Sequence, residues 1–192
     1  MKRFPIRCLP GVYIFLAVAL ILVPIKWLLA WLAAALLHEM FHILSLWICG
    51  GSVTSVELGF MGAKIYTDNV SCLKMSVCAL AGPLAGVLLA LTIRITPRLA
   101  LCGAIQSIYN LVPLYPFDGG RAVKGIAEQF LSGGTAVKFL RIWENTVLLL
   151  LSAFALFSIF FFQMGIFLLV WVSVLVYKNK KIPCKGKRLR VQ

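Results

Sequence analysis

The sequence is poor in charge, and above all in acidic residues. Only 13% of its 192 residues are charged, about half of the roughly 25% typical of a soluble domain, while 61% are apolar. This hydrophobicity excludes a disordered chain, and a soluble domain of this length could not bury so much apolar surface. The composition therefore predicts a membrane protein, and the length predicts a single domain over residues 1–192.

Cysteine pairs are also lacking. The chain has six cysteines, but none of them forms a CxxC pair, and most stand inside apolar runs. This pattern excludes the disulfide framework of small secreted domains. We therefore expect the cysteines to be small buried hydrophobic residues.

Long apolar runs are what the sequence does contain. A helix that crosses a bilayer needs about 20 mostly apolar residues, and the runs lie at residues 9–25, 27–48, 71–95, 99–116 and 139–177. The last run is too long for one helix, so we expect two helices with a break at residues 163–165; one long tilted helix is the alternative. The fold class predicted is an all-α polytopic membrane protein with about six transmembrane helices.

A short stretch between the second and third runs has a different pattern. Residues 50–68 are rich in glycine, and Val56, Leu58 and Phe60 alternate with polar or small residues. This alternation predicts a small β-hairpin. In the third run, Gly82 and Gly86 stand four residues apart, a spacing that lets two membrane helices approach closely. A polar connector is expected at residues 117–136.

The excess of basic residues indicates an orientation. With six helices and both termini in the cytoplasm, all of the 19 basic residues except Lys26, Arg94 and Arg98 fall on the cytoplasmic side, as positively charged loops usually do. The basic tail at residues 178–192 could bind nucleic acid, but a basic cluster beside a membrane helix more often contacts anionic lipid. We therefore expect the bilayer, and no nucleic acid, as a partner.

The only two histidines stand four residues apart, as His38-Glu39-Met40-Phe41-His42. Positions i and i+4 lie on one face of a helix, so both imidazoles can reach one Zn²⁺ with Glu39 beside the metal-bound water. The metal lowers the pKa of that water, and the glutamate takes its proton. The alternative to a zinc site is that the two histidines only cap a polar cavity. Ionisable groups in membrane helices are usually functional, which favours the zinc site.

A catalytic zinc site needs a third protein ligand and an open position. Since no third histidine exists, a cysteine or one of the six carboxylates must supply it. Asp118 follows Asn110, Pro113 and Pro116 and precedes Gly119, so it stands at the broken end of the fourth run. The irregular backbone can direct this carboxylate into the helix bundle, although an Asp-Gly pair is also a common turn.

These motifs together resemble a known family. The HExxH motif on one apolar run, the pattern from Asn110 to Gly119 on a later one, and the Ala81-Gly82-Pro83 stretch between them are similar to the site-2 proteases, which are intramembrane zinc metalloproteases. The short six-helix layout most resembles the branch of the stage IV sporulation protein FB. The similarity covers about residues 10–125 well.

The resemblance implies how the chain is divided. It places a catalytic core at about residues 27–121, accessory helices at about 9–25 and 137–177, and a basic cytoplasmic tail at 178–192. We expect neither the PDZ domain of many family members nor the nucleotide-binding CBS domain of the sporulation branch. Whether ATP affects activity is left open by the sequence.

The resemblance also implies the roles of single residues. One Zn²⁺ would be bound by His38, His42 and Asp118, with Glu39 as the general base and Asn110 positioning substrate or stabilising the oxyanion. The expected enzyme is a metalloendopeptidase of a bacterial membrane, and its substrate is a membrane-associated protein such as a sigma-factor precursor in sporulation. An inhibitory membrane protein is a further partner that the sequence leaves open.

Two other functions remain possible from the sequence. The chain could be an inert membrane metal-binding regulator, although such a protein has no need of Glu39. It could be a cation transporter, but transporters often contain internal repeats, and the two halves show none. For a protease, the hairpin could add a strand of unwound substrate to its edge.

Overall fold

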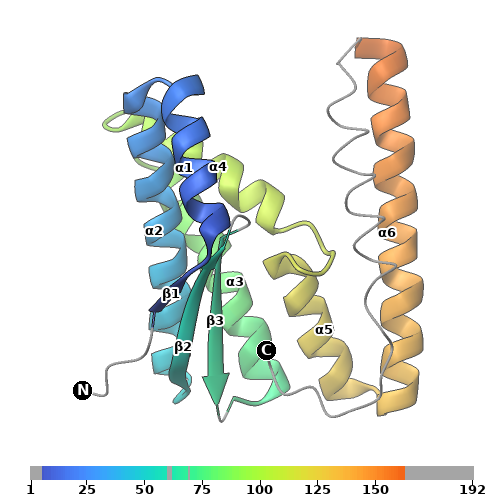
Figure 1. Cartoon of the computed structure of the whole chain (residues 1–192). Coiled ribbons are helices and arrows are strands. Elements are labelled where there is room, and N and C mark those ends of the chain that lie inside the picture. The colour runs from blue at the N-terminus through green and yellow to red at the C-terminus, as the bar shows by residue number, and fades with distance from the viewer. Residues whose placement is uncertain (1–5, 60–61, 69, 163–192) are drawn as a thin grey trace.

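The computed structural model describes residues 6–59, 62–68 and 70–162, which form six helices and a small sheet (Figure 1). The helices are α1 (Pro10–Leu22), α2 (Ile25–Ile48), α3 (Cys72–Ala90), α4 (Pro97–Asn110), α5 (Asp118–Phe130) and α6 (Gly133–Phe162). The strands are β1 (Ile6–Cys8), β2 (Ser52–Gly59) and β3 (Gly62–Asp68). The fold is thus mainly helical, as predicted, with a minor β part.

Three of the described helices are long and apolar enough to cross a membrane: α2, α3 and residues 133–158 of α6. The prediction of six spanning helices is therefore not supported within the described residues. The first run forms only the 13-residue α1, about 20 Å long at 1.5 Å per residue, and the fourth forms the 14-residue α4. The break expected at residues 163–165 lies outside the described residues.

The predicted hairpin is present, and it gains a strand that the sequence did not predict. Strands β2 and β3 pair antiparallel, while β1 pairs parallel to β2, with Ile6 opposite Val56. Val56 is the buried residue of β2. The strand order β1-β2-β3 leaves β3 at one edge of the sheet.

Local sequence signals account for several helix ends. Proline at the first helical position is favourable because its missing N–H is not needed there, and both α1 and α4 begin at a proline. Helix α2 ends where Gly50 adopts a φ of +77°, a left-handed conformation typical of the residue after a helix. The N–H groups of Gly50 and Gly51 then bond back to the carbonyls of Trp47 and Leu46.

Helices α3 and α4 pack closely through small residues. A Cβ atom on Gly86 would meet the Ser107 Oγ and the Gly103 carbonyl, and the Ser107 hydroxyl donates a hydrogen bond to the Pro83 carbonyl at 2.7 Å. The packing role predicted for Gly86 is therefore present in the structure.

Of the five described cysteines, which are all free thiols, only Cys78 and Cys102 are buried.

The segment predicted as a polar connector, residues 117–136, contains a helix, α5, that was not predicted. Its glycines allow close helix packing. A Cβ atom on Gly125 would lie 2.5 Å from the Cys72 carbonyl oxygen, and the Ser76 hydroxyl donates to the Ala122 carbonyl at 2.9 Å. Both contacts fix α5 against α3.

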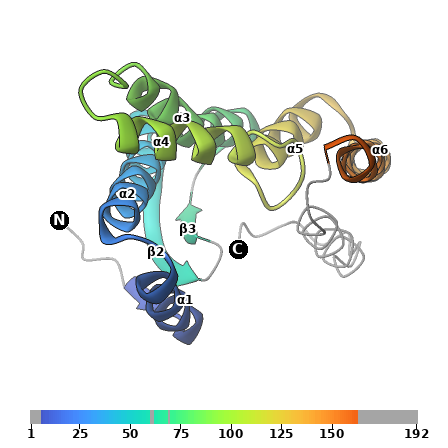
Figure 2. The same cartoon turned by 90° about the horizontal axis from the view of Figure 1, so that it is seen from above.

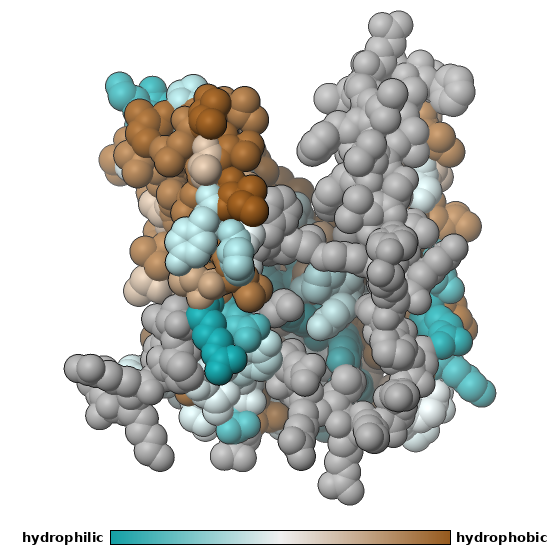
Figure 3. All heavy atoms as spheres, viewed as in Figure 1, coloured by the Kyte–Doolittle hydropathy of each residue, from teal (hydrophilic) through white to brown (hydrophobic). Residues whose placement is uncertain are grey.

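The elements form two unequal parts. Helices α2, α3 and α4 pack against one another and α5 packs on α3, whereas α6 stands apart on the far side of α5 (Figure 2). Strand β3 lies on the side of the sheet that faces α6 in both views. Figure 3 shows hydrophobic side chains over the upper part of α1 and α2, with hydrophilic ones gathered lower on the molecule.

Candidate metal centre

Two histidines and one carboxylate meet at the junction of α2, α3 and α5. Because His38 and His42 stand one helical turn apart on α2, they present their Nε2 atoms 3.2 Å from each other. The Asp118 Oδ2 atom lies 3.0 Å from the His38 Nε2 and 3.2 Å from the His42 Nε2. These three residues form a group that could bind a metal ion.

The separations within this group fit a tetrahedral zinc site. Zinc binds histidine nitrogen and carboxylate oxygen at about 2.0–2.2 Å, so neighbouring ligand atoms of a regular tetrahedron lie about 3.3 Å apart. The three separations of 3.0, 3.2 and 3.2 Å are only slightly shorter. His38 and Asp118 are buried, and His42 is partly buried, so water competes little for the site.

The second nitrogen of His42 is oriented by α3. Its Nδ1 donates a hydrogen bond to the Cys78 carbonyl at 2.7 Å. A carbonyl only accepts, so the proton belongs on Nδ1 and the Nε2 lone pair points into the site, as in most metal-binding histidines. The buried Nδ1 of His38 has no hydrogen-bond partner within the described part of the chain, so the polar contacts of this ring are made by Nε2.

Asp118 is positioned by the segment that we call the proline loop, residues 111–117. Helix α4 ends at Asn110, and α5 begins at Asp118 itself. The loop lies directly against the first turn of α5: a Cβ atom on Gly119 would meet the Leu111 carbonyl, and one on Gly120 would meet the backbone of Leu114. Since only glycine leaves this space, the Asp-Gly-Gly sequence fixes the position of the carboxylate.

The two oxygen atoms of Asp118 have different partners. Oδ2 faces both histidines, whereas Oδ1 lies 3.7 Å from the Arg121 Nη1, one turn further along α5. This division leaves one oxygen as the ligand and lets a cation orient the other. The Arg121 side chain is 36% exposed, so it lies where α5 reaches the surface.

Gly82 forms the wall of the site on α3. A Cβ atom at this position would lie 2.6 Å from the His38 Nε2 and closer still to the His42 Nε2. Any side chain here would occupy the space into which both ligand nitrogens point. Gly82 was predicted only to pack helices, and its place beside the ligands is a feature that the sequence reading missed.

The two remaining candidate residues flank the ligand group. The Asn110 Nδ2 lies 3.4 Å from the His38 Nε2, so the last residue of α4 contacts the site. Glu39 is partly buried on α2 and lies between the two histidines in sequence. The structure thus brings together His38, His42, Asp118 and Asn110.

Two other carboxylates that could have served as ligands have partners elsewhere. The Tyr66 hydroxyl donates to the Glu57 Oε2 at 2.9 Å, which links β2 and β3. This hydrogen bond to the carboxylate raises the pKa of the Tyr66 phenol above its usual value. Glu128 forms an ion pair with Lys124 at 3.9 Å on α5. Asp118 is therefore the carboxylate that joins the histidines in the described part of the chain.

The sequence contains signals for some of the residues that were missed. Arg121 follows Asp118 by three residues, which places both on one face of a helix, but only if α5 is recognised as a helix. The Cys78 carbonyl carries no signal, because any residue has one. Gly82 cannot be told apart from other small residues in the sequence unless the residues of α2 that it faces are known.

Comparisons with known proteins bear on the fold. No protein-family model and no curated protein matches the chain in sequence. Among solved structures, the Site-2 Protease from Methanocaldococcus jannaschii is similar with a TM-score of 0.63 and 17% identity, over 98% of this chain and 97% of that chain. The chain therefore has the fold of a site-2 protease.

Proposed function

We propose that this protein is an intramembrane zinc metalloprotease that hydrolyses peptide bonds of membrane-associated substrates within or near the bilayer. The observation that carries the proposal is the convergence of the His38 Nε2, His42 Nε2 and Asp118 Oδ2 atoms within 3.2 Å of one another. One helix long and apolar enough to cross a membrane, α2, supplies both histidines, and the similar solved structure is itself a site-2 protease.

His38, His42 and Asp118 would bind one zinc ion. When bound, zinc supplies Lewis acidity, which lowers the pKa of a water molecule and polarises a carbonyl group. Glu39 accepts the proton of the attacking water at its carboxylate and transfers it to the leaving amine. Arg121 holds the Oδ1 atom of Asp118 away from the ligand position.

Asn110 would act on the substrate carbonyl. Its amide nitrogen reaches within 3.4 Å of the His38 Nε2, so it can donate a hydrogen bond to a group placed beside the metal ligands. A preorganised donor of this kind stabilises the oxyanion of the transition state, and its removal typically costs about 10²–10³-fold in rate. Asn110→Ala should therefore reduce cleavage and leave zinc binding unchanged.

The decisive experiment separates metal binding from hydrolysis. Glu39→Gln should retain one zinc ion per chain, measured by elemental analysis, and lose cleavage of a membrane-tethered substrate. Asp118→Asn should weaken zinc binding, while the control Glu128→Gln, which changes a carboxylate paired with Lys124 on α5, should leave both properties unchanged. Cleavage by Glu39→Gln at the parent rate would contradict the assignment of the base.

The same assay addresses the alternatives. An inert metal-binding regulator would retain zinc and bind partners, but the parent would cleave none of the substrates tested. A cation transporter would move ions in proteoliposomes and would not depend on Glu39 for hydrolysis. Neither alternative accounts for a carboxylate that stands between two metal ligands in the HExxH motif.

We further propose that the substrate pairs with the edge of β3. A helical substrate must unwind before cleavage, and an extended segment can add to a sheet edge by main-chain hydrogen bonds. Within the described residues, β3 pairs with β2 on one side only. The test replaces Ile65, Tyr66 and Thr67 by proline, one at a time. Cleavage should fall most in the variant whose replaced N–H points away from β2. Unchanged cleavage by all three variants would contradict this mode of binding.

The distribution of basic residues bears on the orientation of the protein in the membrane. We propose that the protein lies in a bacterial membrane with both termini in the cytoplasm. This orientation rests on the six-helix layout expected from the sequence, in which all basic residues except Lys26, Arg94 and Arg98 fall on the cytoplasmic side. Labelling of single cysteines from either side of the membrane tests the orientation.

The resemblance to the sporulation branch favours a membrane-tethered sigma-factor precursor as the substrate. Co-expression of candidate precursors with the parent and with Glu39→Gln would identify it.

A further inference from the structure

Helix α6 meets the rest of the described protein mainly at α5 and at the proline loop (Figure 1). It lies outside the group of helices that carry the candidate ligands, and the sequence alone placed it among the accessory helices. Its contacts nevertheless fall on the segment that ends at Asp118. The nature of these contacts indicates what α6 does.

The first contact is a hydrogen bond from an indole. The Trp143 Nε1 donates to the Pro113 carbonyl at 3.0 Å. In a continuous helix this carbonyl would accept from the N–H of residue 117, but the Phe117 N–H bonds to the Leu114 carbonyl instead. A carbonyl without a donor is costly in a membrane, so Trp143 supplies the partner that the broken helix has lost.

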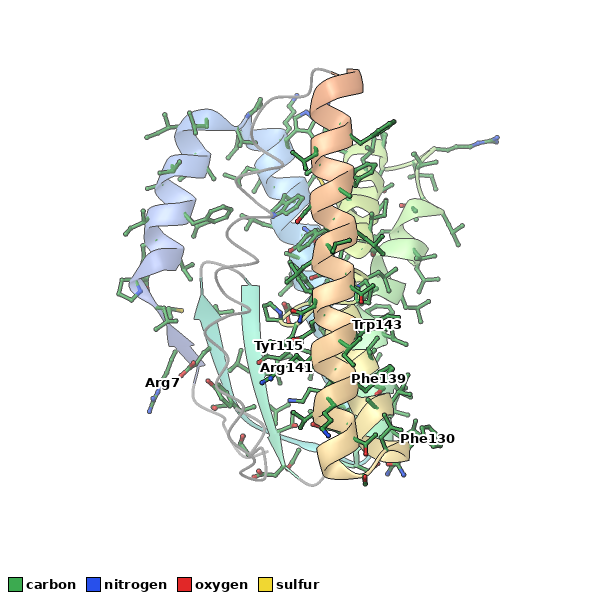
Figure 4. The ribbon with its side chains drawn as sticks, turned by 90° about the vertical axis from the view of Figure 1, so that its right-hand side faces the viewer. Arg7, Tyr115, Phe130, Phe139, Arg141 and Trp143 are labelled. Carbon is green, nitrogen blue, oxygen red and sulfur yellow. The ribbon has the colours of Figure 1, made fainter. Side chains whose placement is uncertain are left out.

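The second contact is apolar and lies beside the first. Leu148 of α6 packs with Leu114 and Phe117 of the proline loop in a buried cluster, and Leu114 is only 1% exposed. Phe139 stacks on Trp143, with ring centroids 6.0 Å apart and an interplanar angle of 25°. Figure 4 shows Phe139 and Trp143 on the same side of α6, with Arg141 on the other side. The indole is therefore oriented by its own helix.

The proline loop is thus held between two elements. On one side the backbone of α5 approaches it at Gly119 and Gly120, and on the other side α6 contacts it through Trp143 and Leu148. Both ends of the loop carry site residues, Asn110 and Asp118. A shift of the loop would move the Asp118 Oδ2 away from the histidines.

We propose that Trp143 is a positioning residue for the metal centre: its hydrogen bond to the Pro113 carbonyl fixes the proline loop and, through it, the Asp118 carboxylate. This assignment rests on the proposed metal site. It makes α6 a structural part of that site. Removal of a group that hydrogen-bonds directly to a metal ligand typically reduces metal affinity by about 10–100-fold. Trp143 acts through the loop, so we expect an effect at the lower end of this range.

The test measures zinc affinity of the full chain in detergent, after removal of metal, by competition with a fluorescent chelator. Trp143→Phe keeps an aromatic ring and removes the N–H, and we expect about tenfold weaker zinc binding. The matched control is Trp47→Phe on α2, whose side chain is 70% exposed, and it should bind like the parent. Equal affinities of the two variants would overturn the proposal.

A second measurement separates positioning from general destabilisation. Amide hydrogen exchange of the metal-free Trp143→Phe protein should increase in residues 111–121 and stay at parent rates in α2 and α3. A general increase across all helices would overturn the positioning role. Replacement of the Trp143 indole by benzothiophene, which has the same shape but no N–H, should reproduce the loss of affinity, and parent-like affinity of that protein would also overturn it.

Asp118→Asn is measured in parallel to separate this inference from the proposed function. If Asp118→Asn binds zinc like the parent, the metal site itself is wrong. If Asp118→Asn weakens binding and Trp143→Phe does not, only the role of Trp143 is wrong.

Discussion

The junction of α2, α3 and α5 and the contact of α6 with the proline loop are built in opposite ways. At the junction, Gly82 and Gly125 stand where any side chain would collide with a ligand nitrogen or a neighbouring backbone. At α6, large side chains such as Trp143 and Leu148 fill the contact. Added atoms should therefore be most harmful at the junction, whereas removed atoms should be most harmful at α6.

Gly82→Ala tests the junction and should have the largest effect. The new methyl group would lie 2.6 Å from the His38 Nε2, inside the space of a metal ion. We expect zinc affinity to fall by roughly a hundredfold or more, beyond the usual range for neighbouring residues, and cleavage to fall with it. Chelator competition measures the affinity.

The control for this variant is Gly134→Ala on α6, where a Cβ atom would meet nothing within 4 Å. It should bind zinc like the parent and unfold no more easily. If Gly82→Ala also binds zinc like the parent, the junction tolerates added atoms, and the proposed difference between the two regions is wrong.

Gly125→Ala extends the same comparison from the ligands to helix packing. Its Cβ atom would lie 2.5 Å from the Cys72 carbonyl oxygen, which belongs to rigid backbone. Overpacking of this kind typically costs about 1–3 kcal/mol, and we expect the upper part of that range in the free energy of unfolding. Thermal unfolding in detergent measures it, and an unchanged Tm would show that α5 can move away from α3.

Leu148→Ala tests the opposite expectation at α6. The side chain is 7% exposed and packs on the proline loop, so its truncation leaves a cavity. Leucine-to-alanine changes in protein cores cost about 2–5 kcal/mol, and we expect about 2 kcal/mol here because α6 can adjust. Leu149→Ala is the matched control, since its neighbouring side chain is 68% exposed. Equal loss of stability in both variants would contradict a specific contact.

Tyr66 should give the smallest effect, because it lies in the sheet outside both regions. Its hydrogen bond to Glu57 raises the pKa of the phenol, so the neutral form is favoured in the folded protein. The stabilisation is present below the ordinary phenol pKa of about 10, and it is lost as the pH rises through the higher folded value.

The titration of Tyr66 is obtained by subtracting the phenolate absorbance of Tyr66→Phe from that of the parent at each pH. Glu57→Gln should lower the pKa of Tyr66 towards its ordinary value. At neutral pH, Tyr66→Phe should leave zinc affinity unchanged. An identical Tyr66 titration in the parent and in Glu57→Gln would show that the hydrogen bond is absent in solution.

The sequence predicted the parts of the molecule whose signals are local. The spacing of His38 and His42 determines that they share a helix face, and the alternation around Val56 determines the hairpin. The contacts of β1, Gly82 and Trp143 depend on residues far away in the sequence. The proline loop shows the limit most clearly, since its prolines predict a broken helix but not which side chain completes its hydrogen bonds.

Helix length was a further source of error. Apolar composition predicted that each run crosses the membrane, whereas only α2, α3 and residues 133–158 of α6 are long and apolar enough among the described helices. Helix α5, which is rich in glycine at its start, was not predicted. Glycine can favour a turn or allow close helix packing, and the choice depends on the neighbouring helix, which a single sequence does not reveal.

The shortness of α1 has a consequence for the surrounding lipid. Its 13 residues extend about 20 Å, whereas the apolar part of α6, 26 residues long, extends about 39 Å. A flat hydrocarbon layer of about 30 Å is thicker than α1 is long, so α1 can reach only part of the way across it. The apolar part of α6 is longer than this layer, so we expect α6 to tilt, at a cost of fractions of a kcal/mol per Å of mismatch. A thicker bilayer should therefore reduce the tilt of α6.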